Sequence, residues 1–153
     1  MSERKGKNIL FISGIFEGHI SGIVEVVKDL VSLGHSVTFN ILDSFSDRLK
    51  NTGAKLIIYH IDKSDIRLPP KAPPIAVNMF IVYKAYEQIL SEGIKSNDKY
   101  DYLIVDHFFD ERELNKIFKA NTVITTYTCV FISKDSPKAS INKDIYSRKN
   151  RFF

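Results

Sequence analysis

Two ionisable side chains in this sequence are placed where a general base and its partner could work together. His19 follows the apolar run 8–13 at the start of a helical pattern, and Asp106 ends a second apolar run, 101–106. A neutral imidazole can accept a proton near neutral pH, and the positive end of a helix dipole disfavours its charged form. A neighbouring carboxylate can hold one ring nitrogen and stabilise the protonated ring. The residue types predict proton abstraction; the alternative is a helix-cap histidine and a turn aspartate.

This pair can meet only if the two apolar runs are neighbouring strands of one sheet. Apolar or β-branched runs alternate with segments whose apolar residues recur every three or four positions. Alternating strands and helices predict an α/β fold, a Rossmann-like doubly wound parallel sheet with helices on both faces. We expect strands over 8–13, 36–42, 55–59, 101–106 and 122–127, and helices over 20–31, 44–52, 75–96 and 111–120.

The strand order predicts where a ligand would bind. Right-handed crossovers favour the order 3-2-1-4-5, in which the first and fourth strands are neighbours and the chain reverses direction between them. Ligands of open α/β sheets bind beyond the carboxyl ends of the strands at such a reversal. His19 and Asp106 follow those two strand ends, so we expect both side chains at one site.

Composition excludes several classes of protein. The 153 residues fit one domain over 1–133, followed by a basic tail over 134–153 that is predicted to be poorly ordered. That tail carries the whole net charge of +4, so the neutral remainder predicts no nucleic-acid surface. Cys129 is the single cysteine and forms no internal disulfide, which suits a reducing compartment. The apolar run near the start is too short for a signal peptide or a membrane span, so we expect a cytoplasmic protein.

Other candidate motifs are weaker. Gly14 and Gly18 lack the spacing of a dinucleotide or phosphate-binding loop. His35 follows Gly34 where a strand begins, which favours a structural role, and His60 ends a strand with no ligand partner expected nearby. The segment from Asp106 to Glu111 is rich in acidic residues and histidine, but consecutive strand residues point to opposite faces. We therefore expect no metal site.

Three segments resemble one enzyme family. Residues 7–43 (KNILFISGIFEGHISGIVEVVKDLVSLGHSVTFNILD) contain a strand, a Gly-His turn, an amphipathic helix, a second Gly-His pair and a strand. Residues 45–59 (FSDRLKNTGAKLIIY) and 101–109 (DYLIVDHFF) continue the pattern. This order resembles the opening of the macrolide and UDP-glycosyl/glucuronosyl transferases, the inverting GT-B family 1 enzymes.

The resemblance implies the N-terminal, acceptor-binding half of a GT-B fold. It makes His19 the base and Asp106 its partner, in the transfer of a sugar from a UDP-sugar to a hydroxyl of a small-molecule acceptor. Acceptor contacts are expected from Phe16, Gly18, Phe80 and Tyr83. The donor would need a C-terminal domain or partner chain, so the isolated chain would be inactive, and no cofactor is expected. The alternatives are a non-catalytic Rossmann-like binding module and one half of a split enzyme.

Overall fold

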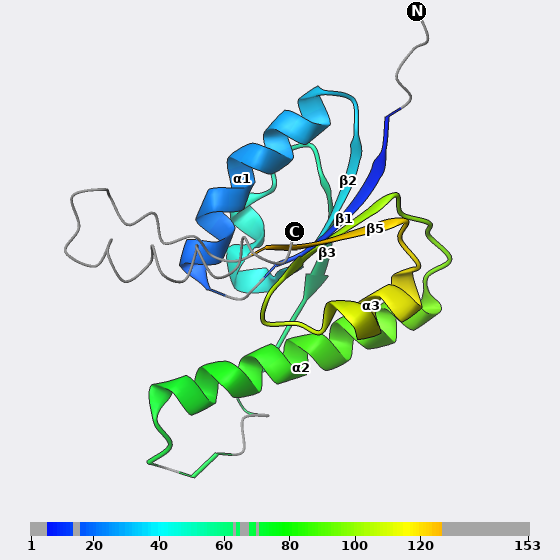
Figure 1. Cartoon of the computed structure of the whole chain (residues 1–153). Helices are drawn as coiled ribbons and strands as arrows, with labels where there is room; N and C mark the ends of the chain where they lie inside the picture. Colours follow the sequence, from blue (N-terminus) through cyan, green and yellow to red (C-terminus); the bar gives the residue numbers. More distant parts are fainter. Residues whose placement is uncertain (1–5, 14–15, 63, 65–67, 70, 127–153) are drawn as a thin grey trace, which may run out of the picture.

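The computed structural model describes residues 6–13, 16–62, 64, 68–69 and 71–126. Strands and helices alternate along the chain, as the sequence predicts (Figure 1). The elements are β1 (Asn8–Ile12), α1 (Glu17–Ser32), β2 (Ser36–Leu42), η1 (Asp43–Arg48), β3 (Lys55–Tyr59), α2 (Pro74–Lys95), β4 (Tyr102–Asp106), α3 (Glu111–Phe118) and β5 (Thr122–Thr126). A short 3-10 helix, η1, replaces the longer helix expected over 44–52. The predicted tail and Cys129 lie outside the described residues.

The five strands form one parallel sheet in the order β3-β2-β1-β4-β5, which confirms the predicted order. Strand β1 pairs with both β2 and β4, and Ile12 is opposite Val105 in the register with β4. The residues that follow these two positions therefore leave the sheet side by side. This places the ends of β1 and β4 at the reversal where a ligand site is expected.

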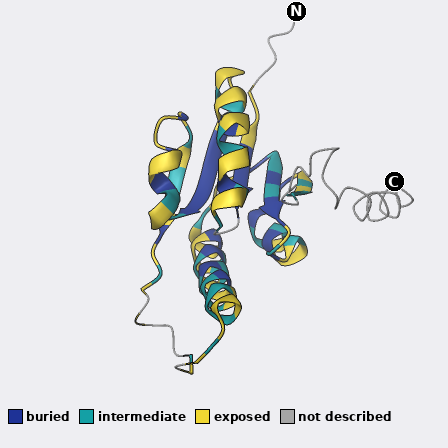
Figure 2. Ribbon diagram, turned by 90° about the vertical axis from the view of Figure 1, so that its left-hand side faces the viewer, coloured by how far each residue is buried: buried dark blue, intermediate teal, exposed yellow. Residues whose placement is uncertain are grey.

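Helices cover both faces of the sheet, and the alternation of strand side chains assigns each residue to one face. Figure 1 shows α1 on one side and α2 with α3 on the other, and Figure 2 shows the buried strands between them. One core cluster joins α1 to Phe11, Phe39 and their neighbours; the other joins α2 and α3 to Leu10, Leu103 and theirs. Ile104 packs on the α1 side, so Asp106, two residues later, is placed on that same side.

Local sequence explains where the helices end and how closely they approach. Gly34 has φ +84° just after α1, the left-handed conformation in which glycine ends helices at little cost. Pro74 occupies the first turn of α2, where its missing N–H breaks no helical hydrogen bond. At Gly93 a Cβ atom would lie 2.6 Å from the Phe118 ring, so glycine permits the close packing of α2 on α3. Among the described residues, no helix is long and apolar enough to cross a membrane.

Candidate active site

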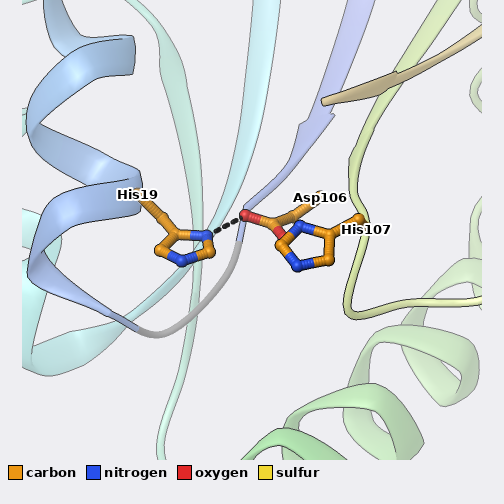
Figure 3. Close-up of side chains that lie close together, drawn as sticks. All are labelled: His19, Asp106 and His107. Carbon is orange, nitrogen blue, oxygen red and sulfur yellow. Dashed lines mark hydrogen bonds and ion pairs between the residues drawn. The ribbon is translucent and has the colours of Figure 1, made fainter. Parts of the chain in front are cut away.

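His19 and Asp106 meet beyond the carboxyl ends of β1 and β4, as the sequence predicts. His19 lies in the first turn of α1, and its backbone N–H donates to the carbonyl oxygen of Phe16 at 2.9 Å. Asp106 is the last residue of β4. The His19 Nδ1 atom forms a hydrogen bond with Asp106 Oδ2 (Figure 3). The topology and this bond together support an imidazole–carboxylate pair.

Both members of this pair are removed from bulk water. The side chain of Asp106 is 2% exposed and that of His19 is 11% exposed. The second carboxylate oxygen, Oδ1, accepts a hydrogen bond from the backbone N–H of Phe108 at 3.3 Å. A hydrogen bond in such low-dielectric surroundings is electrostatically stronger than one in water. The carboxylate therefore holds the imidazole in one orientation, with Nε2 pointing away from it (Figure 3).

A second imidazole, that of His107, contacts the same carboxylate. His107 Nδ1 lies 3.1 Å from Asp106 Oδ1, and its ring lies nearly parallel to that of His19, with centroids 5.8 Å apart. The expectation that consecutive residues here point to opposite faces is wrong, because β4 ends at Asp106 and His107 already belongs to a turn. Asp110, by contrast, caps α3 by accepting from the N–H groups of Arg112 and Glu113.

Aromatic side chains surround the pair. The half-buried Phe16 ring lies 5.5 Å from the His19 ring and 5.3 Å from the Phe108 ring, centroid to centroid. Phe108 also lies 5.2 Å from His19. Phe16 thus contacts the dyad, whereas nothing in the sequence pattern had singled out Phe108. The feature of the sequence that could have identified Phe108 is its position directly after the strand that carries Asp106.

The other predicted acceptor residues lie in two places. Gly18 directly precedes His19 and is exposed; apart from its chain neighbours and the backbone of α1, no described residue would lie within 4 Å of a Cβ atom at this position. Phe80 and Tyr83 lie on α2, where the Lys84 ammonium is 5.8 Å and 5.6 Å from their ring centroids. Tyr83 is 54% exposed. Acceptor binding by these three residues stays a prediction.

A second histidine–aspartate pair lies at the same edge of the sheet. His60, just after β3, contacts Asp43, the first residue after β2, through Nδ1 and Oδ2. The expectation that His60 has no partner nearby is therefore wrong. Both side chains are exposed, by 72% and 43%. The hydrogen bond and charge of Asp43 raise the pKa of His60.

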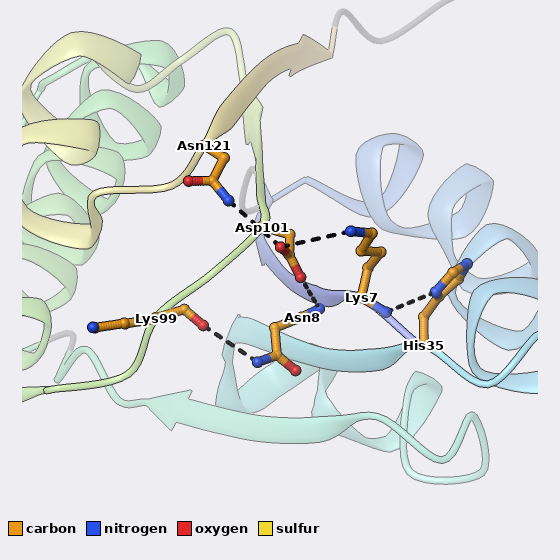
Figure 4. Close-up of polar contacts among 6 residues, drawn as sticks. All are labelled: Lys7, Asn8, His35, Lys99, Asp101 and Asn121. Atoms are coloured by element: carbon orange, nitrogen blue, oxygen red, sulfur yellow. Dashed lines mark hydrogen bonds and ion pairs between the residues drawn. The ribbon is translucent and has the colours of Figure 1, made fainter. Parts of the chain in front are cut away.

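His35 lies at the opposite edge of the sheet, where the strands begin. Its Nδ1 accepts a hydrogen bond from the backbone N–H of Lys7 at 3.1 Å (Figure 4). Nearby, Asp101 Oδ2 accepts from the backbone N–H of Asn8 at 2.9 Å and joins the start of β1 to the segment before β4. These contacts give His35 the structural role that its sequence position predicts.

Known proteins resemble this chain in part of its sequence and in its fold. No protein-family model matches the sequence. The chain is 36% identical over 53 residues to oleandomycin glycosyltransferase of Streptomyces antibioticus, a match that covers 35% of this chain and 12% of that protein. CalG4, the calicheamicin glycosyltransferase, has a similar structure, with a TM-score of 0.63 and 18% identity over 95% of this chain and 36% of CalG4.

A similar fold also occurs in a domain of a hydrogenase. The C-terminal domain of the PF1911 hydrogenase from Pyrococcus furiosus has a TM-score of 0.56 and 14% identity, covering 83% of this chain and 95% of that domain. At such identities the likeness concerns the fold, so activity must be argued from the site. By fold and by partial sequence similarity, this chain resembles the N-terminal part of GT-B family 1 glycosyltransferases and spans about a third of the length of CalG4.

Proposed function

We propose that this chain is the acceptor-binding domain of an inverting glycosyltransferase. The observation that carries the proposal is the hydrogen bond from His19 to the buried Asp106 carboxylate at the junction of β1 and β4. A carboxylate in this position keeps a proton on Nδ1 of the neutral imidazole and leaves the basic lone pair on Nε2. Nε2 is the ring nitrogen that points away from the carboxylate (Figure 3).

The proposed reaction is a single displacement. His19 Nε2 takes the proton from a hydroxyl of the acceptor as the acceptor oxygen bonds to the anomeric carbon of the sugar. The bond from that carbon to the nucleotide's phosphate oxygen breaks, and its electron pair leaves with the phosphate. Attack from the opposite side inverts the anomeric centre. Asp106 stabilises the imidazolium formed in this step.

The surroundings of His19 favour a small organic acceptor. Phe16 and Phe108 form an aromatic wall against the imidazole, which suits the apolar face of a ring-bearing molecule. Gly18, which directly precedes His19, is exposed and adds no side chain beside the imidazole. Phe80 and Tyr83 on α2 would extend the same acceptor surface.

The donor would be a UDP-sugar bound by a C-terminal domain or a partner chain. Its negative diphosphate needs cationic side chains or helix N-termini, and residues 1–133 have no net positive charge to replace them. We therefore expect isothermal titration of the chain alone to show no UDP binding tighter than about 1 mM, or about 4 kcal/mol. Micromolar binding of UDP would contradict the proposal that the donor site lies in another domain or chain.

The competing function is a non-catalytic binding module, because a shared fold does not determine whether a domain is catalytic. The two functions differ in what His19 does. A binding module needs His19 for packing only, whereas the transferase needs its Nε2 lone pair.

The deciding experiment joins the chain to the donor domain of a macrolide glycosyltransferase and measures sugar transfer to a panel of hydroxyl acceptors. General-base catalysis predicts that His19→Ala lowers kcat by about 10²- to 10⁴-fold while the domain stays folded. The matched control is His60→Ala, which removes a histidine from the exposed pair and should leave kcat unchanged within about twofold. A folded His19→Ala variant with wild-type turnover would exclude the proposed mechanism.

A further inference from the structure

His19, Asp106 and His107 lie close enough together to share one ion. One nitrogen or oxygen from each of these side chains lies within 4.8 Å of the others. Asp106 contacts one imidazole through Oδ2 and lies 3.1 Å from the other through Oδ1. From this convergence we propose that the three side chains form a binding site for a single Zn²⁺-like divalent transition metal.

The donor set fits such an ion. Zn²⁺ binds imidazole nitrogen and carboxylate oxygen at about 2.0–2.2 Å, in sites that combine three protein ligands with one water. Tetrahedral geometry at those lengths places neighbouring ligand atoms about 3.3 Å apart. The observed 3.1 Å between His107 Nδ1 and Asp106 Oδ1 is close to that spacing. The three ligand atoms lie within 4.8 Å of one another, so side-chain rotations would bring the remaining pairs to this spacing.

The backbone already holds two of the three ligands in place. The N–H of His107 donates to the carbonyl oxygen of Thr126 at 3.0 Å, which ties the turn to β5. The N–H of Phe109 donates to the carbonyl oxygen of Asp106 at 3.0 Å and closes the turn. The backbone of Asp106 and His107 is therefore in place before a metal binds, and the Asp106 carboxylate already orients the His19 ring.

The same donor set predicts selectivity. Two imidazoles and one carboxylate suit Zn²⁺, Co²⁺ and Ni²⁺, whereas Mg²⁺ and Ca²⁺ prefer sites made of oxygen ligands. Among the described residues, His19, Asp106 and His107 are the group of three side chains that could hold an ion. The exposed pair of His60 and Asp43 has no described third ligand of this kind. It therefore serves as an internal control.

Metal binding would change the protonation of His19. In the metal-free pair the imidazole proton is on Nδ1, facing Asp106, and the lone pair is on Nε2. A metal on Nδ1 uses that nitrogen's lone pair, so the single proton of the neutral ring moves to Nε2. Nε2 can then no longer accept a proton. If the proposed sugar transfer is correct, metal occupancy and catalysis exclude each other.

The test is a Zn²⁺ titration of the untagged chain carrying Cys129→Ser, in competition with a coloured chelator. Serine replaces the thiol because thiolates bind Zn²⁺ strongly. We expect the wild-type chain to bind one Zn²⁺, and Mg²⁺ not to compete for the site. The affinity for Zn²⁺ should be at least about tenfold lower in His107→Ala and unchanged in His60→Ala. Equal Zn²⁺ binding by wild type and a folded His107→Ala variant, or no stoichiometric binding, would overturn the proposal.

A second measurement locates the ion without removing a ligand. NMR spectra of the imidazole groups should show Zn²⁺ perturbing His19 and His107 together, with His60 unchanged. Perturbation of His60 or His35 alone would identify an adventitious surface site only and overturn the proposal. Both experiments read metal binding rather than turnover, so their failure is distinguishable from failure of the proposed transferase activity.

Discussion

Two histidine–aspartate pairs lie at the same edge of one sheet, and they differ in their surroundings rather than in their contact. In each, an imidazole Nδ1 meets a carboxylate Oδ2. Asp106 is 2% exposed and His19 11%, whereas His60 is 72% exposed and Asp43 43%. A hydrogen bond between these residue types is therefore a poor indicator of catalysis by itself. Burial and the aromatic wall distinguish the pair that could act as a base.

The physical consequence of this difference is the strength of the coupling between the two side chains. Water and salt screen an exposed pair, and long exposed side chains lose entropy when they hold one geometry. A pair enclosed by protein is screened much less and is held by its neighbours. Asp106 can therefore determine the orientation of His19, while Asp43 mainly biases the protonation of an exposed imidazole.

The largest predicted difference is in turnover of the enzyme completed with a donor domain. Asp106→Asn should lower kcat by up to about 10⁴-fold, because the amide can stabilise neither the tautomer nor the imidazolium. Asp43→Asn makes the same chemical change in the exposed pair and should leave kcat unchanged within about twofold. Equal losses of kcat in the two variants would contradict the claim that only the buried pair takes part in catalysis.

A smaller difference is expected in stability. Asp106→Ala leaves two partly buried donors, the His19 ring and the Phe108 N–H, without this acceptor and should lower the free energy of unfolding by about 1–3 kcal/mol. At a pH above the folded pKa of His60, Asp43→Ala should leave the free energy of unfolding unchanged within error, because water replaces the lost acceptor. Urea denaturation of the isolated domain measures both. A larger loss of unfolding free energy in Asp43→Ala than in Asp106→Ala would show that the exposure of a pair does not determine its contribution to stability.

The arrangement of the buried pair could be predicted from the sequence, whereas the exposed pair was missed although its residues follow two neighbouring predicted strands in the same way. Alternating strands and helices indicate the order 3-2-1-4-5, which brings the ends of β1 and β4 together and with them His19 and Asp106. The same reasoning applies to Asp43 and His60, because they directly follow β2 and β3, whose last residues, Leu42 and Tyr59, are opposite each other in the register. The strand order predicts which strand ends meet, and it does not predict which side chains turn toward each other.

His107 and Phe108 show the same limit. Alternation of side chains predicts the face of Asp106 correctly, because Ile104 and Asp106 belong to one strand. It fails one residue later, where the strand ends and the backbone turns. The expected strand over 101–106 ends at the same residue as β4, so the error lay in applying strand alternation to the turn that follows, where the candidate site is built.

The smallest predicted effect concerns pH. Asp43 raises the pKa of His60, with a lesser contribution from Asp62. The folded pKa thus lies above the unfolded value of about 6.5, so the pair stabilises the fold below that pH and loses this contribution as the pH rises through the folded pKa. In an NMR titration, Asp43→Asn should lower the pKa of His60, and Asp62→Asn should lower it less. An unchanged value in Asp43→Asn would show that the exposed pair does not form in solution.

The central claim is that His19 and Asp106 act as one unit, and a double-mutant cycle on kcat of the completed enzyme tests it most directly. If Asp106 works only through His19, the combined His19→Ala and Asp106→Asn variant should retain the same residual activity as His19→Ala alone, within about threefold. If instead the two losses multiply, the residues contribute independently, and the dyad assigned to this domain would be contradicted.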